Sequence, residues 1–261
     1  MTIRDVVVPI EEFAPLSLQA SYDNAGLVVG RLSDTVSGVL LAVDVTDEVL
    51  DEAEAVGANL IITHHPIIFH PLKRFNSEGY VQRCVERAIR KGIALYACHT
   101  NLDSTPEGMS WRLAHLLGVE HLQVLEPRPD NPEAGFGVVG NLPEARPMLD
   151  YLREVAERLK VEALRHSAVV SPTVSRVAIC TGSGASLMEE ARRAEADLYI
   201  TADLKYNDFM TPDRAFVVAD VGHFESEYCA IDILFDVLSK KMFTFAVRKS
   251  EHSCNPIHYL V

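Results

Sequence analysis

A strand–helix–strand pattern occurs twice in this chain, and this repeat constrains the fold more than any other sequence feature. Residues 37–63 align without gaps on residues 175–201 at a constant offset of 138, and eight of the 27 aligned positions are identical. Two such units can converge on similar patterns, whereas the matching loop lengths favour duplication. Either origin predicts two related α/β halves.

Strands and helices alternate through the rest of the chain. In the first half the patterns predict strands over residues 39–45, 60–63 and 93–98 and helices over 46–56, 78–91 and 106–117. Beyond residue 132 they predict strands over 135–140 and 242–247, helices over 147–159 and 224–240, and a further α/β run over 174–218. This order predicts an α/β fold with largely parallel sheets.

A proline-rich segment separates the two predicted halves. Residues 126–132 read Glu-Pro-Arg-Pro-Asp-Asn-Pro, a composition typical of a linker. We therefore expect a first half over residues 1–125, to which residues 235–261 return, and a second half over residues 133–234.

Composition and charge disfavour several classes of protein. The formal net charge is −13, which argues against a nucleic-acid-binding surface because phosphates require clustered Lys and Arg. No apolar run reaches the length of a membrane span, and the first residues lack a signal-peptide pattern. The five cysteines show no CxxC spacing, which is typical of reduced thiols. We expect a cytoplasmic protein that does not bind a membrane.

Two adjacent histidines, His64 and His65, follow a predicted strand and precede Pro66. Neighbouring side chains on a strand point to opposite faces, so a pair that serves one site must lie where the strand ends. Pro66 supports this, because proline cannot continue a central strand. The aligned positions of the repeat hold Ala202 and Asp203, so the strand–helix–strand unit itself does not require the histidines. Two neutral imidazoles are suitable metal ligands.

His99 and Asp103 directly follow the next predicted strand. The carboxyl ends of parallel strands meet at one edge of a sheet, so we expect these side chains to lie near His64 and His65. Taken alone, Asp103 is also explained as a helix N-cap or turn residue ahead of Pro106, and His99 as a hydrogen-bonded core histidine.

A third group comprises His223 and Glu227, which are four residues apart at the start of a predicted helix. This spacing places both side chains on one face and directs Glu225 elsewhere. Glu227 alone is also explained by the positive end of the helix. Three His/carboxylate groups, each at a strand end or helix start, together favour metal binding.

Four motifs follow one another along nearly the whole chain. They are Tyr22-Asp23-Asn24-Ala25-Gly26-Leu27 with Gly30, Thr63-His64-His65-Pro66, His99-Thr100-Asn101-Leu102-Asp103, and Gly222-His223 with Ser226-Glu227. In this order they resemble the family labelled GTP cyclohydrolase 1 type 2 homologues, also called NIF-three-like dinuclear metal-centre proteins, in the short form without an inserted domain.

The resemblance implies a dinuclear metal centre at strand carboxyl ends between the two halves. The residues that match the family's metal ligands are His64, His65, Asp103, His223 and Glu227, with Glu227 as the bridge. The resemblance also implies a ring-shaped homohexamer whose metal sites face an inner cavity. Mixed His and carboxylate ligands suit zinc, iron or manganese, so we expect two divalent ions per subunit.

Five ligands for two metals leave coordination positions open, unlike the closed ligand sets of structural zinc sites. We therefore expect a metal-dependent hydrolase of a small substrate, such as a nucleotide or another phosphate compound, with His99 as the acid/base residue or as a support for a ligand. The family label names GTP, but nothing in these residues selects guanine. Two other readings remain: a metal-stabilised scaffold or partner-binding ring without turnover, and a metal chaperone.

Two loops allow more than one interpretation. Residues 23–26 form either a simple turn or, by the resemblance, a loop that lines the site. Residues 181–186 are rich in Gly and Ser between a strand and a helix, which suits either a plain turn or an anion cradle without the lysine of a nucleotide-binding loop.

Overall fold

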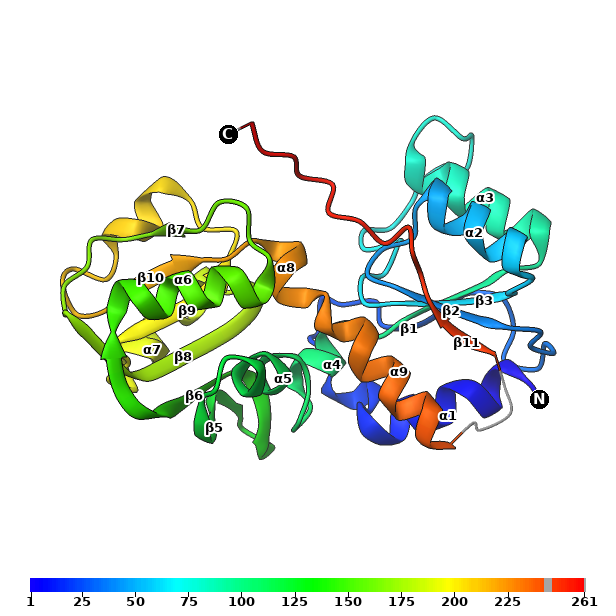
Figure 1. Ribbon diagram of the computed structural model, residues 1–261. Helices are drawn as coiled ribbons and strands as arrows, with labels where there is room; N and C mark the ends of the chain where they lie inside the picture. The colour runs from blue at the N-terminus through cyan, green and yellow to red at the C-terminus, as the bar shows by residue number, and fades with distance from the viewer. Residues whose placement is uncertain (242–245, 261) are drawn as a thin grey trace. The chain divides into compact units, whose positions relative to one another are not determined.

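Five strands form the sheet of the first of two units, which comprises Met1–Thr105 and Ala230–Cys254. The computed structural model describes residues 1–241 and 246–260 (Figure 1). The strand order is β1 (Gly26–Val29), β4 (Ala94–Ala97), β3 (Leu60–Thr63), β2 (Val39–Ala42) and β11 (Val247–Lys249). All neighbours are parallel except β1 and β4. Of the strand predicted over residues 242–247, residues 242–245 lie outside the described part of the chain.

Helices cover both faces of this sheet. In Figure 1, α2 (Asp47–Val56) and α3 (Tyr80–Lys91) lie on one side, and α1 (Ile3–Phe13) and α9 (Cys229–Lys241) lie on the other. Buried residues of α2 and α3 pack against alternate residues of β2, β3 and β4, because successive strand side chains point to opposite faces. As the sequence predicts, Thr46 caps α2 by accepting a hydrogen bond from Val49 N at 3.2 Å.

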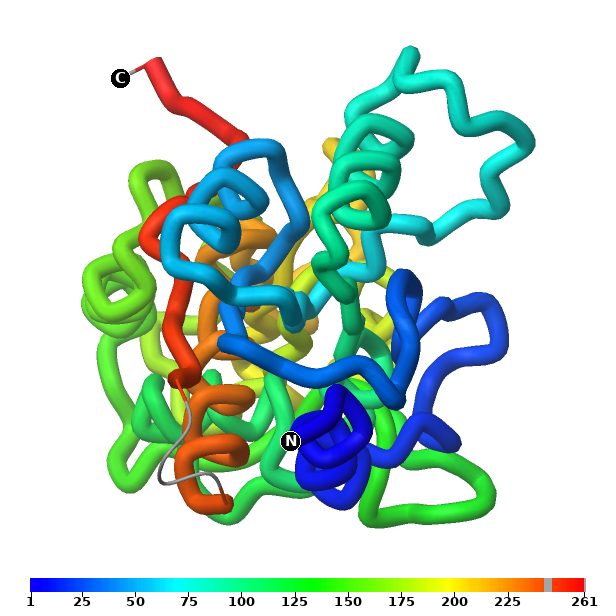
Figure 2. The backbone as a smooth tube through the Cα atoms, turned by 90° about the vertical axis from the view of Figure 1, so that its right-hand side faces the viewer, coloured from blue at the N-terminus to red at the C-terminus, as the bar shows by residue number. Residues whose placement is uncertain are grey.

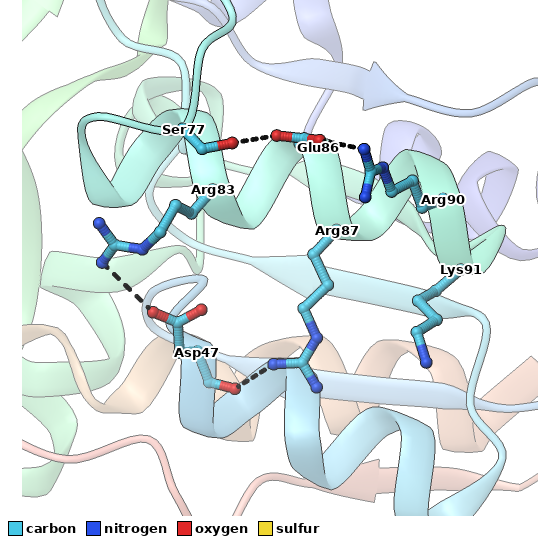
Figure 3. A pocket seen from close by; sticks show the side chains of 7 residues that line it. All are labelled: Asp47, Ser77, Arg83, Glu86, Arg87, Arg90 and Lys91. Carbon is cyan, nitrogen blue, oxygen red and sulfur yellow. Dashed lines mark hydrogen bonds and ion pairs between the residues drawn. The ribbon is translucent and has the colours of Figure 1, made fainter.

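Ion pairs join α2 to α3, which lie side by side in Figures 1 and 2. Arg87 Nη2 lies 2.7 Å from Glu54 Oε1. In the pocket drawn in Figure 3, Arg83 Nη2 lies 3.5 Å from Asp47 Oδ2. The other cations of this pocket, Arg90 and Lys91, also have carboxylate partners. Arg83, Arg87 and Lys91 thus link α3 to α2, whereas Arg90 pairs with Glu86 within α3.

The second unit comprises Pro106–Cys229 and Asn255–Val261 and contains a six-stranded mixed sheet. Its strand order is β5 (Glu120–Arg128), β6 (Asn131–Pro147), β8 (Thr173–Ser183), β9 (Leu198–Ala202), β10 (Val217–Asp220) and β7 (Arg165–His166). Only β8, β9 and β10 are mutually parallel, so this sheet is less parallel than predicted. One core packs α5 (Met109–Leu116) and α6 (Met148–Leu159) on the sheet, and a second core packs α7 (Met188–Arg193) on its other face.

The proline-rich segment over residues 126–132 is not a linker. It ends β5 and begins β6, which pair as an antiparallel hairpin. Pro127 is tolerated because β5 is the edge strand of this sheet, where a missing backbone donor leaves no partner unsatisfied. Pro129 lies between the two strands, and Pro132 lies at the start of β6, before the residues that pair with β8. The two units instead divide after Thr105 and after Cys229, rather than near the predicted residues 125 and 234.

The repeat seen in the sequence has a close structural counterpart. β2 pairs with β3 through Val39 and Leu60, and β8 pairs with β9 through the equivalent Val177 and Leu198. The backbone N–H of Ser37 donates to Asn59 Oδ1 at 2.8 Å, and that of Ser175 donates to Asp197 Oδ2 at 2.9 Å. Strand register and turn hydrogen bonds are thus shared, as duplication of one unit predicts.

The helix predicted over residues 224–240 is divided in two. The short α8 (His223–Glu227) is followed by α9, which begins at Cys229. Among the helices of the described residues, none combines the length and the apolar character needed to cross a bilayer.

The repeat supplies a test of core packing. Leu198 is fully buried in β9, so Leu198→Ala should lower the free energy of unfolding by about 3 kcal/mol through lost burial and a cavity. Ile89→Ala is the control, because Ile89 is 61% exposed and its loss should change stability by less than about 0.5 kcal/mol. Urea denaturation measures both, and equal effects would contradict the assigned core.

Candidate metal centre

His64 and His65 lie directly after β3, where the strand leaves the sheet. Their backbone N–H groups still donate to Ala42 O at 3.3 Å and Val43 O at 3.0 Å, so the chain keeps its position beside β2. The chain turns enough that both imidazoles lie on one side, with ring centroids 4.9 Å apart. The strand end therefore brings together two side chains that a continued strand would separate.

His99 joins this pair from the end of β4. It precedes α4 (Thr100–Ser104), and its ring centroid lies 5.2 Å from that of His64 and 5.5 Å from that of His65. One ring nitrogen from each of the three histidines lies within 4.8 Å of the others, a grouping that can hold a metal ion.

Each of these imidazoles is held from behind through Nδ1. His64 Nδ1 lies 2.9 Å from Cys98 O, and His65 Nδ1 lies 2.8 Å from Asp44 Oδ1. His99 Nδ1 lies 2.7 Å from Asp23 Oδ1. Because these partners only accept hydrogen bonds, they keep the proton on Nδ1 and leave the Nε2 lone pair for a metal or a proton.

Asp103 lies inside α4 and does not cap a helix. Its Oδ1 is 4.0 Å from His64 Nε2. This separation is too long for a hydrogen bond, but two ligands that each lie about 2 Å from one zinc ion can be up to about 4 Å apart. The structure thus places Asp103 where the sequence predicted it, beside His64.

Asp23 is a buried anion behind His99. Burial raises its pKa, but hydrogen bonds from His99 and Thr100 outweigh this and lower the pKa to about 2. Its Oδ2 accepts from the Thr100 backbone N–H at 3.0 Å and also from the Thr100 hydroxyl. The loop over residues 23–26 is therefore tied to the imidazole group.

In the second unit, His223 and Glu227 lie on one face of α8, as their spacing predicts. His223 Nε2 is 2.9 Å from Glu227 Oε2, and His223 Nδ1 is 2.8 Å from Asp203 Oδ2. Glu225 points elsewhere and accepts a hydrogen bond from Asn255 Nδ2 at 2.9 Å. Burial lowers the pKa of His223, but Glu227 and then Asp203 outweigh it and raise the pKa to about 9.

Gly182 lies near the end of β8, which extends through the first half of the loop predicted over residues 181–186, and it leaves room for Glu227. An added Cβ would lie 2.0 Å from Glu227 Oε1, and the backbone φ is +63°. The Gly182 N–H donates to Ser226 Oγ at 3.0 Å. The Thr181 N–H donates to Ser110 Oγ at 3.2 Å, so the first two amides of residues 181–186 are engaged within the chain, and that of Gly182 supports α8.

The sequence reasoning missed the carboxylates that orient the histidines, Asp44 and Asp203. The sequence contains a signal for each of these two carboxylates. Asp44 follows a parallel strand, where site residues collect, and Asp203 occupies the repeat position equivalent to His65. Only the structure assigns each to a particular imidazole.

The ion pair in α8 predicts how metal-free protein responds to pH. Because the pKa of His223 lies above its ordinary 6.5, the pair should stabilise the fold fully below pH 6.5 and lose that effect as pH rises through about 9. The Hε1 resonance of His223 should titrate near 9 by NMR and move toward 6.5 in Glu227→Gln. A midpoint near 6.5 in the unmodified chain would contradict the geometry.

The close approach of Glu227 to Gly182 supplies a second test. Gly182→Ala should displace the carboxylate and lower the pKa of His223 in metal-free protein, because a methyl group cannot lie 2.0 Å from an oxygen. Gly57→Ala is the matched control, since Gly57 has a similar φ of +70° and nothing within 4 Å of the added Cβ. It should cost stability while leaving the His223 titration unchanged. The same NMR titration compares the two variants.

Known proteins resemble this chain over nearly its full length. Proteins named GTP cyclohydrolase 1 type 2 homolog share 34% identity over 230 residues in Clostridium perfringens, 87% of each chain, and 32% over 267 residues in Lactococcus lactis, 99% of each. The crystal structure of a Staphylococcus aureus hypothetical protein matches 100% of this chain and 99% of its own, with a TM-score of 0.92 and 24% identity. The model of the Duf34/NIF3 (NGG1p interacting factor 3) family matches residues 1–256, and the chain therefore belongs to this family.

Proposed function

We propose that the chain holds two divalent metal ions and acts as a metal-dependent hydrolase on a small nucleotide or another phosphate compound. The observation that supports this most directly is the hydrogen bonding of four histidines at Nδ1. In His64, His65, His99 and His223, Nδ1 contacts a carbonyl or carboxylate oxygen. Such partners fix the tautomer and the orientation that a metal ligand requires.

The proposed ligands are His64, His65 and Asp103 from the first unit and His223 and Glu227 from the second, with Glu227 as the bridge. This set follows the family resemblance, and its donor types suit zinc, iron or manganese. Bound ions would supply Lewis acidity and activate water for attack at neutral pH. The metal-free ion pair between His223 and Glu227 must give up its proton when a metal binds.

His99 is the proposed acid/base residue. Its Nδ1 proton is held by the Asp23 carboxylate, so Nε2 can accept a proton from the reacting group and later return it. Asp23 stays ionised above its pKa of about 2, and it stabilises the imidazolium while His99 carries the additional proton.

Metal binding is tested by elemental analysis of purified protein. We expect two ions per chain, and at least about tenfold weaker binding of one ion in Asp103→Ala and in Glu227→Ala. Glu225→Ala is the control, because Glu225 lies on the same helix and bonds to Asn255 instead. Full occupancy in both ligand variants would contradict the proposed centre.

Hydrolysis is tested with metal-loaded protein and a panel of nucleotides and phosphoesters. His99→Gln should lower kcat about 10²- to 10⁴-fold while metal content stays unchanged. If no compound is turned over and a chelator lowers Tm, the metal-stabilised scaffold is favoured instead. Exchangeable metal passed to a client protein would favour a metal chaperone.

The homohexameric ring stays a prediction, and light scattering after size-exclusion chromatography checks it.

A further inference from the structure

Two exposed aromatic side chains lie next to the imidazole group of the first unit. Tyr22 is 67% exposed and Phe69 is 39% exposed. Their ring centroids are 6.4 Å apart with an interplanar angle of 71°. Phe69 in turn meets His99 edge to face, with a centroid distance of 5.8 Å and an angle of 90°. A continuous line of rings therefore leads from the surface to His99.

The loops that carry these rings are tied to each other and to the site. Asn24 Nδ2 donates to Ile68 O at 2.7 Å, which joins the residues that adjoin Tyr22 and Phe69. Asp23, the residue after Tyr22, is anchored by His99 and Thr100. The aromatic pair is thus held in place relative to His99 by hydrogen bonds of the neighbouring residues.

Single exposed aromatic residues are common on protein surfaces and need no explanation. This pair differs because it adjoins three oriented imidazoles that can hold a metal. Rigid aromatic rings beside a reactive site provide a surface for stacking, and every heteroaromatic base offers a face that can use it.

We propose that Tyr22 and Phe69 form an aromatic shelf that binds a planar heteroaromatic ring of the substrate beside His99. The shelf narrows the substrate class of the proposed hydrolase to compounds that carry such a ring, and in that respect it rests on the proposed function. Stacking selects for a flat ring and does not choose among bases, since it uses the ring face rather than hydrogen-bonding groups at the edge.

Binding to metal-loaded full-length protein tests the shelf without turnover. The probes are adenosine and guanosine 5′-monophosphate, with ribose 5-phosphate as the matched compound that keeps the phosphate and lacks the base. Calorimetry should show at least about tenfold tighter binding of the purine monophosphates. Tyr22→Leu and Phe69→Leu should each remove most of this preference and leave ribose 5-phosphate binding unchanged.

Control variants separate stacking from loss of fold. Phe69→Tyr should keep the preference because it keeps the ring face, and Tyr206→Leu should keep it because Tyr206 is an exposed aromatic of the second unit. Each variant is first checked for metal content and Tm. Equal binding of all three probes, no binding of the purine monophosphates, or an unchanged preference in both leucine variants would overturn the proposal.

The outcomes also distinguish the shelf from the hydrolase. Base-selective binding that depends on Tyr22 and Phe69, without turnover of any compound, would keep the shelf and reject hydrolysis. Turnover of phosphoesters without a base, at a KM unchanged in both leucine variants, would keep hydrolysis and reject the shelf.

Discussion

The parallel pairing of β3 with β2 and β4 is the constraint on which the imidazole group depends. Thr63 is level with Ala42 on one side and with Ala97 on the other, so the three strands end together. The residues that follow them are Asp44, His65 and His99, which come from distant points of the chain. A shift in register would separate the histidines from their partners while leaving the sheet intact.

Hydrogen bonding then gives the cluster its chemical character. If all three neighbouring imidazoles were protonated, their positive charges would repel one another. Acceptors behind the rings hold the Nδ1 protons outward and direct the Nε2 lone pairs toward a common space. In the second unit an acceptor at Nδ1 likewise orients His223, through the Asp203 carboxylate. There the neighbouring Glu227 keeps a second proton on the imidazole when metal is absent.

The repeat provides one scaffold for two different tasks. Asp44 in the first unit is equivalent to Gly182 in the second, and His65 is equivalent to Asp203. Asp44 orients a histidine, whereas Gly182 stays small so that Glu227 can approach its backbone. Strand register and turn hydrogen bonds are shared, yet the residues at the strand ends have diverged.

Local patterns in the sequence determined most of the secondary structure, including β3 to the residue and the shared spacing of His223 and Glu227, because these depend on neighbours a few residues apart. They also located the histidine groups, since polar residues that follow a parallel strand lie at its carboxyl end, where sites in α/β folds form. The hairpin over residues 126–132 was misread as a linker because edge position, which makes prolines acceptable in a strand, is a tertiary property. Tertiary structure alone decided which carboxylate orients which imidazole and which rings adjoin His99, because those contacts join residues up to 76 positions apart.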